Sequence, residues 1–224
     1  MDEHQYLASL HNNYALYLQD YLIRMMELEL YSADDPFTHG NELQKQELGF
    51  YIHRSGKTAS SKYKGGSFGG IDLVINGIGF LIRSIEVYKI HGEALIQESL
   101  IEGPNLTLNK LSDLSGWQFE DLEKNLQLIQ YKWNPIQPIY GARGGLTLKK
   151  SNDIQSWSQY LILPRRSAIF QPKKYKETWF VVDINRKDIQ CRSIKKYQEE
   201  FNDQASKNDL LLNSRSTPLQ CAGY

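Results

Sequence analysis

The chain has 224 residues, of which 41% are hydrophobic and 12% aromatic, enough to build the core of one large or two small domains. Its formal net charge is zero, so no overall field directs it to nucleic acid or to a membrane, and such binding requires a local patch. With two cysteines, the sequence has neither zinc-ligand spacing nor a disulfide framework, which favours a reducing compartment. The acidic, polar start and the lack of a long apolar run predict a cytoplasmic protein without a secretory signal or membrane helix.

The first predicted element is an amphipathic helix over residues 5–22. Apolar side chains recur along it at helical spacing, at Leu7, Leu10, Tyr14, Leu18 and Tyr21. This spacing predicts a helix that packs on the body of the protein. Its two histidines, His4 and His11, are expected at the surface.

A short strand is predicted next, over Met25–Tyr31. Alternation places Met26, Leu28 and Leu30 on one face, and Glu27, Glu29 and Tyr31 on the other. Two readings stay open: an edge strand with a solvated polar face, or a strand that holds a carboxylate base beside a stacking surface. The acidic turn that follows contains Asp34-Asp35-Pro36 and leads to His39, a residue that in a loop is more often structural than catalytic.

The segment Tyr63–Gly70 has four glycines in eight residues, so it bends sharply or lets another backbone approach closely. Its lysine and two aromatic side chains, Lys64, Tyr63 and Phe68, suit a phosphate and a base, although a plain flexible turn has the same composition. Upstream, Leu48–His53 has some strand character.

A hairpin follows the glycine-rich segment. The apolar runs Ile71–Ile75 and Ile78–Ile85 are predicted strands, and the Asn76-Gly77 between them is a strong turn signal. Asp72 and Arg83 are charged residues within these runs, so they need partners or a function. A structural pair and a functional role are both compatible with the pattern.

The rest of the chain gives weaker signals. Helices are predicted over Leu106–Leu114 and Phe119–Ile129, and strands over Trp157–Leu163 and Phe180–Ile184. Residues 165–196 hold ten Lys or Arg and three Asp or Glu, with aromatic residues between them. This stretch is either a phosphate-facing patch or a solvated charged face.

Taken in order over roughly residues 25–170, these stretches resemble the 3-methyladenine (alkylpurine) DNA glycosylases. Met26-Glu27-Leu28-Glu29-Leu30-Tyr31 is similar to that family's strand hydrophobic-Glu-hydrophobic-Glu-Ala-Tyr, with Leu30 in place of the alanine. Ser32–His39 resembles its acidic loop that ends in a histidine. Four further segments resemble the family's later motifs: Leu81–Glu86, Gly103–Leu111, Tyr140–Leu146 and Trp157–Arg166.

The resemblance implies a role for each matched residue. Glu29 would be the general base that activates water, and Tyr31 and His39 would sandwich a base flipped out of the duplex. Asp72 falls near the position of the asparagine on the floor of the family's pocket. An aspartate there suits a base whose hydrogen-bond donors differ from those of the bases that the family binds. Arg83 would lie near the DNA backbone or support the pocket.

One region departs from the family. Residues 62–70 are glycine-rich where the family has a tyrosine-rich strand that carries its third aromatic wall and its wedge residue. Tyr63 and Phe68 are the aromatics that remain for base binding and DNA contact. The other residues expected to bind DNA are Lys64, Arg83, Arg143, Arg165 and Arg166.

The chemistry fits this assignment. Turning a base out of the duplex costs on the order of a few kcal/mol, and stacking of that base on aromatic side chains offsets about 1–3 kcal/mol of this cost. Cleavage passes through an oxocarbenium-like state, which a carboxylate such as Glu29 stabilises. Burial raises the pKa of such a carboxylate toward the working pH, which suits a general base. No lysine lies on the predicted strand, which favours hydrolysis over lyase action, and no metal or cofactor is expected.

The expected function is therefore a monofunctional DNA glycosylase, a hydrolase that acts on DNA damage in base excision repair by base flipping. Three alternatives stay open: a glycosylase for bulky hypermodified phage bases in a defence role, a DNA-binding protein on the same scaffold without catalysis, or an unrelated α+β binding domain. The last is favoured if Glu29, Tyr31 and His39 do not converge. The expected partner is DNA, bound by a monomer without membrane contact.

The expected fold is a single α+β domain. It would have a curved, mostly antiparallel, barrel-like sheet with peripheral helices. Residues 1–170 would form the glycosylase-like domain, including the N-terminal helix, and residues 171–224 a basic C-terminal extension packed on the same domain.

Overall fold

The structure is a computed structural model that describes residues 2–32, 34–143, 146, 160 and 163–170, and the backbone of strands at 179–183, 192–193 and 209–213. The fold is of the α+β class, with helices and a curved, mostly antiparallel sheet, as expected from the sequence. The chain divides into two compact units, Met1–Ile136 and Gln137–Tyr224. The boundary expected at residue 170 therefore lies inside the second unit, and the packing of residues 171–224 stays a prediction.

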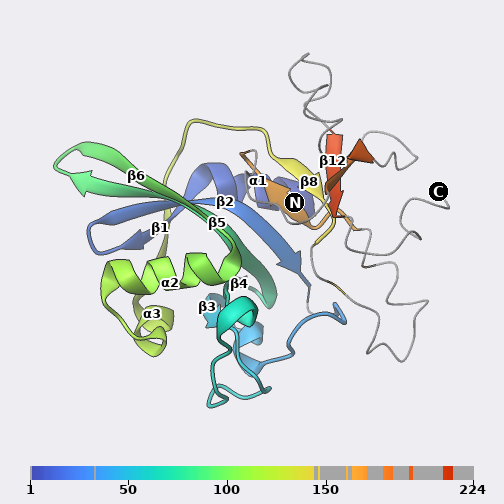
Figure 1. Cartoon of the computed structure of the whole chain (residues 1–224), viewed down its shortest axis with the longest axis horizontal. Helices are drawn as coiled ribbons and strands as arrows, with labels where there is room; N and C mark the ends of the chain where they lie inside the picture. The colour runs from blue at the N-terminus through green and yellow to red at the C-terminus, as the bar shows by residue number, and fades with distance from the viewer. Residues whose placement is uncertain are drawn as a thin grey trace. The chain divides into compact units, whose positions relative to one another are not determined.

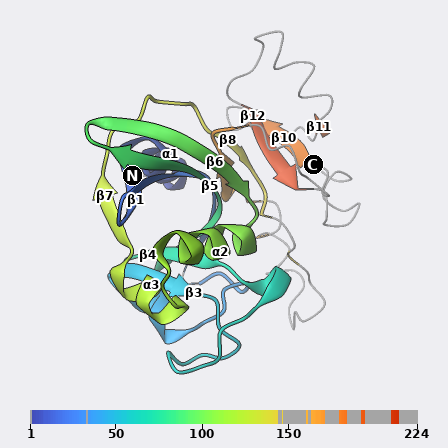
Figure 2. The ribbon, with the colours of Figure 1, turned by 60° about the vertical axis from the view of Figure 1, so that its left-hand side comes forward.

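The sheet of the first unit is organised around two long strands. Its strands in chain order are β1 (Tyr14–Leu18), β2 (Tyr21–Tyr31), β3 (Leu48–Ile52), β4 (Ile71–Ile75), β5 (Ile78–His91), β6 (Ala94–Glu102) and β7 (Gln127–Gln130). β2 pairs with β5 along its whole length, and β1 and then β7 continue the sheet beyond β2. On the other side of β5, β4 and β3 line its first half and β6 its second half. All these pairs are antiparallel, and Figure 2 shows the sheet curling from β7 round to β3.

Three helices cover this sheet. They are α1 (Glu3–Asn13), α2 (Pro104–Ser115) and α3 (Phe119–Asn125), and short 3₁₀ turns lie at Glu42–Lys45 and Gly66–Phe68. The side chain of Asp2 caps α1 by accepting the Gln5 N–H at 2.7 Å. α1 packs on β1 and β2, α2 lies across β5, and α3 packs on β3 (Figure 1). Each helix buries leucines in the core, among them Leu7, Leu108 and Leu122.

Strand β2 lies inside the sheet, so the reading of Met25–Tyr31 as an edge strand with a solvated face is wrong. Every residue from Leu22 to Leu30 is buried. The carboxylates that alternate with its apolar residues are buried too: Glu27 is 2% exposed and Glu29 0%. Charges at this depth require partners, because burying an isolated charge is very costly.

Two predicted helices end early. The helix predicted over 5–22 ends at Asn13, and Tyr14–Leu18 forms β1 instead, followed by a turn at Gln19 with φ +51°. The helix predicted to reach Ile129 ends at Asn125, and the next residues form β7. β1 and β7 pair with each other, so a contact more than a hundred residues apart overrides the local helical spacing.

The central hairpin is confirmed. β4 and β5 meet at Asn76-Gly77, where both residues have positive φ, +50° and +76°, as a tight hairpin turn requires. Strand Leu48–Ile52 and helix Pro104–Ser115 also form where the sequence predicted them. β5 is longer than predicted and runs on to His91.

In the part of the second unit that the structure describes, the strands are β8 (Ile139–Gly141), β9 (Arg166–Ala168), β10 (Trp179–Asp183), β11 (Arg192–Ser193) and β12 (Asp209–Asn213). β8 pairs antiparallel with β9 and parallel with β12, and β10 pairs antiparallel with β11 and β12. β10 confirms the strand predicted over Phe180–Ile184, whereas the one predicted over Trp157–Leu163 falls largely outside the described residues. In the part of the chain that the structure describes, no helix is long and apolar enough to cross a membrane.

His11 lies in the core, so its expected place at the surface is wrong. Its side chain is fully buried, and Nδ1 lies 2.7 Å from the carbonyl oxygen of Met25. Burial is the largest cause that lowers the pKa of His11 to about 4. The folded protein therefore keeps this imidazole neutral at pH values where an unfolded chain protonates it.

This histidine predicts a loss of stability in mild acid. In the folded protein the pKa of His11 lies below the ordinary 6.5. The contribution of His11 to the free energy of unfolding is therefore fully present above about pH 6.5, and it falls by about 3 kcal/mol as the pH drops to about 4. Urea unfolding at pH 7, 5.5 and 4 measures it. His39, whose pKa is also lowered to about 4, contributes similarly, so His11→Asn should halve the pH slope. An unchanged slope in that variant contradicts the assignment.

Candidate functional site

A row of side chains crosses the sheet of the first unit. Glu29 of β2 pairs with Leu81 of β5, Leu81 with Asp72 of β4, and Asp72 with Tyr51 of β3. Side chains directly opposite each other on paired strands point to the same face of a sheet. One face therefore carries two carboxylates and a phenol side by side. Tyr31 follows Glu29 by two residues and shares this face.

A small pocket lies beside this row. It has a volume of about 40 Å³ and is lined by Tyr31, Phe37, Thr38, His39, Gln44, His53 and Asp72. Three of these residues, Tyr31, His39 and Asp72, are residues that the sequence assigned to base binding. A second pocket of about 230 Å³ shares Tyr31, Thr38 and Gln44 with the first and extends to Gly77 and Gly79. The two pockets therefore adjoin at Tyr31.

Asp72 and His53 are hydrogen-bonded to each other in the pocket wall. His53 Nε2 lies 2.9 Å from Asp72 Oδ1, and the side chains are 12% and 3% exposed. Gln44 Nε2 donates to the other carboxylate oxygen, Oδ2, at 3.4 Å. The second ring nitrogen of His53, Nδ1, faces the carbonyl oxygen of Phe68 at 3.4 Å. Both ring nitrogens thus face oxygen acceptors, which fixes the orientation of the His53 ring at the pocket wall.

Sequence reasoning missed His53. The signal that was available is its spacing, because His53 follows Tyr51 by two residues and alternation carries it to the same face of β3. Gly70 shows how tightly the ring is seated: a Cβ added there would lie 3.0 Å from His53 Cε1. The glycine-rich segment therefore lets the backbone pass close to the imidazole.

His39 completes the pocket from a loop. Asp35, which is buried, shapes this loop by accepting the Phe37 N–H at 3.0 Å. His39 Nδ1 lies 3.2 Å from the hydroxyl of Tyr51, and Nε2 lies 3.1 Å from Nζ of Lys64. Burial, with smaller effects of neighbouring positive charge, lowers the pKa of His39 to about 4, so its ring is neutral at pH 7.

Glu29 lies behind Tyr31 and does not line the pocket. The Tyr31 hydroxyl donates to Glu29 Oε2 at 3.0 Å, and Arg83 Nη1 lies 3.1 Å from Glu29 Oε1. The same guanidinium donates from Nε to Glu27 Oε1 at 3.1 Å, and Ser84 donates to Glu27 at 2.8 Å. A bulge around Met26 in the β2–β5 ladder brings these groups together. Arg83 thus pairs with both buried carboxylates, and Glu29 in turn accepts the Tyr31 hydroxyl.

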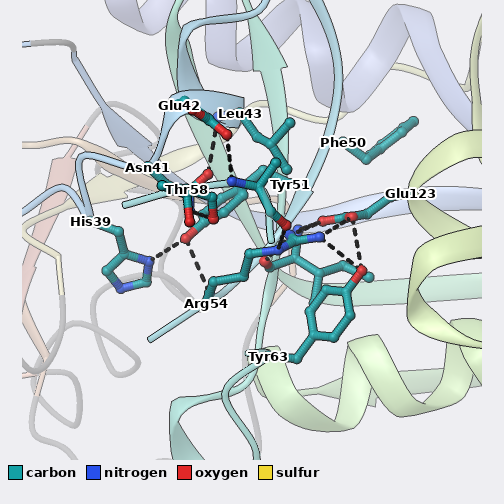
Figure 3. Close-up of polar contacts among 12 residues, drawn as sticks. His39, Asn41, Glu42, Leu43, Phe50, Tyr51, Arg54, Thr58, Tyr63 and Glu123 are labelled. Carbon is teal, nitrogen blue, oxygen red and sulfur yellow. Dashed lines mark hydrogen bonds and ion pairs between the residues drawn. The ribbon is translucent and has the colours of Figure 1, made fainter. Parts of the chain in front are cut away.

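Tyr63 lies in a different network, so the structure does not bring it to the pocket wall. Glu123 of α3 receives Arg54 Nη1 at 2.5 Å and Nη2 at 2.6 Å, and the Tyr63 hydroxyl donates to it at 3.1 Å (Figure 3). The Arg54 guanidinium also lies 4.2 Å from the centre of the Tyr63 ring. These residues line a third hollow, of about 650 Å³.

The residues expected to bind DNA belong to both units. Phe68 is 73% exposed, and Lys64 contacts His39 at the pocket. In the second unit Arg143 and Arg166 are buried, and the Arg165 guanidinium lies 5.6 Å from the ring of Tyr160. The basic stretch 165–196 falls mostly outside the described residues.

The described residues include no group of three or more His, Cys, Asp or Glu side chains that could hold a metal ion. Comparison with known proteins gave no family model, no curated protein and no solved structure that matches the chain. The function must therefore be argued from the pocket itself.

Proposed function

We propose that this protein is a DNA glycosylase that hydrolyses the N-glycosidic bond of a base turned out of the duplex. The observation that carries the proposal is the meeting of Tyr31, His39 and Asp72 in one pocket wall. These residues come from a strand end, a loop and a second strand, and the resemblance to alkylpurine glycosylases assigns all three to the base. An unrelated binding domain is favoured if Glu29, Tyr31 and His39 do not converge; of these three, Tyr31 and His39 line the pocket and Glu29 does not.

The geometry supports Asp72 as the carboxylate that activates water. Its Oδ1 is held by His53, and its Oδ2 lies toward the site of Gly79, where an added Cβ would be 3.6 Å away. A carboxylate at this position stabilises an oxocarbenium-like transition state and takes a proton from the attacking water. The contact with His53 Nε2 keeps the Asp72 carboxylate in place.

Glu29 suits a positioning role better than the catalytic role expected from the sequence. It is fully buried, it shares Arg83 with Glu27, it accepts the Tyr31 hydroxyl, and it is not among the residues that line the pocket. Its hydrogen bond fixes the ring of Tyr31, the face on which a flipped base would stack. Stacking of this kind contributes about 1–3 kcal/mol per base.

A second candidate, a glycosylase for bulky modified bases, is favoured by the adjoining 230 Å³ pocket. That pocket reaches Gly77 and Gly79, two positions without side chains next to Tyr31. A substituent on a base seated against Tyr31 would have room there. The two candidates share the reaction and differ only in the base.

Mass spectrometry of free bases tests the proposal. The protein is incubated with alkylated, deaminated and phage-modified DNA, and the supernatant is analysed for released bases. Release from alkylated or deaminated DNA supports a repair enzyme, and release only from phage-modified DNA supports the second candidate. DNA binding without release from any of the three overturns the enzymatic proposal and favours a DNA-binding protein on this scaffold.

Gly79 provides a paired variant that tests the pocket as the site. A Cβ at this position would make ordinary contacts, 3.6 Å from Asp72 Oδ2 and 3.9 Å from Tyr31 Cβ, so Gly79→Ala should retain base release within about threefold. Gly79→Leu would fill the space between the two residues and should lower release about a hundredfold. Both variants are checked by thermal unfolding. Equal release by two folded variants would place the reaction elsewhere.

A further inference from the structure

Gln44 lies where the two adjoining pockets meet, because it lines both the small pocket of about 40 Å³ and the wider one of about 230 Å³. Its side-chain oxygen Oε1 accepts the backbone N–H of Asn41 at 3.1 Å, which closes a capping box on the 3₁₀ turn. A backbone N–H only donates, so the atom that faces it is the amide oxygen. The Nε2 amino group is thereby turned toward Asp72, and it donates to Oδ2 at 3.4 Å.

This contact leaves hydrogen-bonding capacity on both groups. The amino group has two hydrogens, and the described residues give it one acceptor, Asp72 Oδ2. The Asp72 carboxylate, which is 2% exposed, has about four acceptor positions, and from the described residues it receives His53 at Oδ1 and Gln44 at Oδ2. A donor and an acceptor with unused capacity therefore lie side by side in the wall of the small pocket.

The other polar side chains of the small pocket already have partners. Both ring nitrogens of His39 and of His53 lie within 3.4 Å of another polar atom. The hydroxyls of Tyr31 and Thr38 donate to oxygen atoms at 3.0 Å. Among the described residues, Gln44 is therefore the one that supplies this pocket with an unused N–H.

The size of the small pocket suits water. Its volume is about 40 Å³, whereas a buried water needs about 10–15 Å³ and sites for small organic molecules usually have about 300–1,000 Å³. A water oxygen that lies about 2.9 Å from each of two atoms 3.4 Å apart makes an ordinary hydrogen bond with both. Such a water accepts from Gln44 Nε2 and donates to Asp72 Oδ2.

We propose that Gln44 and Asp72 hold one water molecule between them, and that Gln44 positions this water for attack on the sugar. The attack rests on the proposed function. The water oxygen forms a bond to C1′ while the C1′–N bond breaks, and the electron pair of that bond leaves with the base. Asp72 Oδ2 takes the proton that the water loses and later returns it to the departing base or to solvent. Gln44 acts through the water, so it is a positioning residue.

A crystal structure of the protein without DNA tests the water site. We expect an ordered water within about 3.2 Å of both Gln44 Nε2 and Asp72 Oδ2. In Gln44→Leu, whose side chain has a similar size but cannot donate, this water should be absent. A wild-type structure in which no water contacts both atoms overturns the proposal, whatever the protein does to DNA.

Gln44→Glu tests the positioning role in base release. Glutamate keeps an oxygen for the Asn41 N–H, and so keeps the cap, but it replaces the N–H that holds the water by an acceptor. We expect kcat to fall about 10–100-fold while KM changes by less than about threefold. Gln46→Glu makes the same change in charge two residues further on. Gln46 donates to the carbonyl oxygen of Phe50 and lines neither pocket, so its variant should match the wild type.

Methanol distinguishes a positioned water from a structural effect. As a second nucleophile it leaves a methyl glycoside where the base was released, whereas water leaves an abasic site. Gln44→Ala removes the amide and opens space for the methyl group, so the ratio of methanol product to water product should rise at least about fivefold over the wild type. Gln46→Ala should keep the wild-type ratio. A purely structural effect lowers both products alike.

The two failures are distinguishable. Base release with the same product ratio in Gln44→Ala and the wild type overturns the inference on Gln44 and leaves the glycosylase standing. An ordered water between Gln44 and Asp72, without base release from any modified DNA, supports the water site and overturns the glycosylase.

Discussion

Asp72→Asn is expected to lower base release by about 10²–10⁴-fold, the usual contribution of a positioned general base. The amide keeps the size of the side chain and an oxygen that faces His53 Nε2, 2.9 Å away in the wild type. It cannot take a proton from water or stabilise a developing cation. Release is measured from the DNA that the wild-type protein processes, and binding of the same DNA is measured as the control for folding.

Glu29→Gln is the matched comparison, because both carboxylates belong to the same row across the sheet. The amide oxygen still accepts the Tyr31 hydroxyl, and Arg83 keeps its bond to Glu27, so the pocket wall should persist. We expect release to fall by less than about tenfold. A loss in Glu29→Gln as large as in Asp72→Asn would return the catalytic role to Glu29.

Glu123→Gln should produce the largest loss of stability. The carboxylate accepts two guanidinium nitrogens of Arg54, the backbone N–H of Ile52 at 2.6 Å and the Tyr63 hydroxyl. Glutamine supplies one oxygen and turns an NH₂ toward the donors, leaving the charge of Arg54, which is 5% exposed, without its counter-ion. Breaking a buried pair in this way costs about 3–5 kcal/mol, which lowers the melting temperature by about 10 °C.

Glu120→Gln, three residues earlier on the same helix, is the control. Glu120 pairs with Lys124 at 2.9 Å, but the two side chains are 70% and 63% exposed. Water and salt screen such a pair, so no measurable change in melting temperature is expected. Equal losses in the two variants would show that the Arg54–Glu123 pair does not stabilise the fold as argued.

Elements with a strong local pattern were predictable from the sequence. The Asn76-Gly77 turn specifies its own backbone conformation, and the alternation around Glu29 identifies a strand. Alternation could not tell a solvated face from a buried one, because burial depends on the elements that pack against β2, among them β5 and α1. The helix predicted to residue 22 failed for a related reason, since β1 is held by a strand more than a hundred residues away.

The pocket was predictable only in part. The motif resemblance selected Tyr31, His39 and Asp72, and these do meet. His53 was missed because it gains its role from the β3–β4 register, which no short motif encodes. Tyr63 was assigned to the base because it is an aromatic on the glycine-rich segment, yet its hydroxyl partner Glu123 lies sixty residues further along the chain.

We propose that the pocket lined by Tyr31, His39, His53 and Asp72 is where a base is cleaved from DNA. The most direct test is to quantify free base by mass spectrometry after wild-type protein and Asp72→Asn act on the same modified DNA. We expect free base and an equal amount of abasic sites with the wild-type protein, and neither above background with the variant. Equal release by the two proteins, or none by the wild type from any modified DNA, would contradict it.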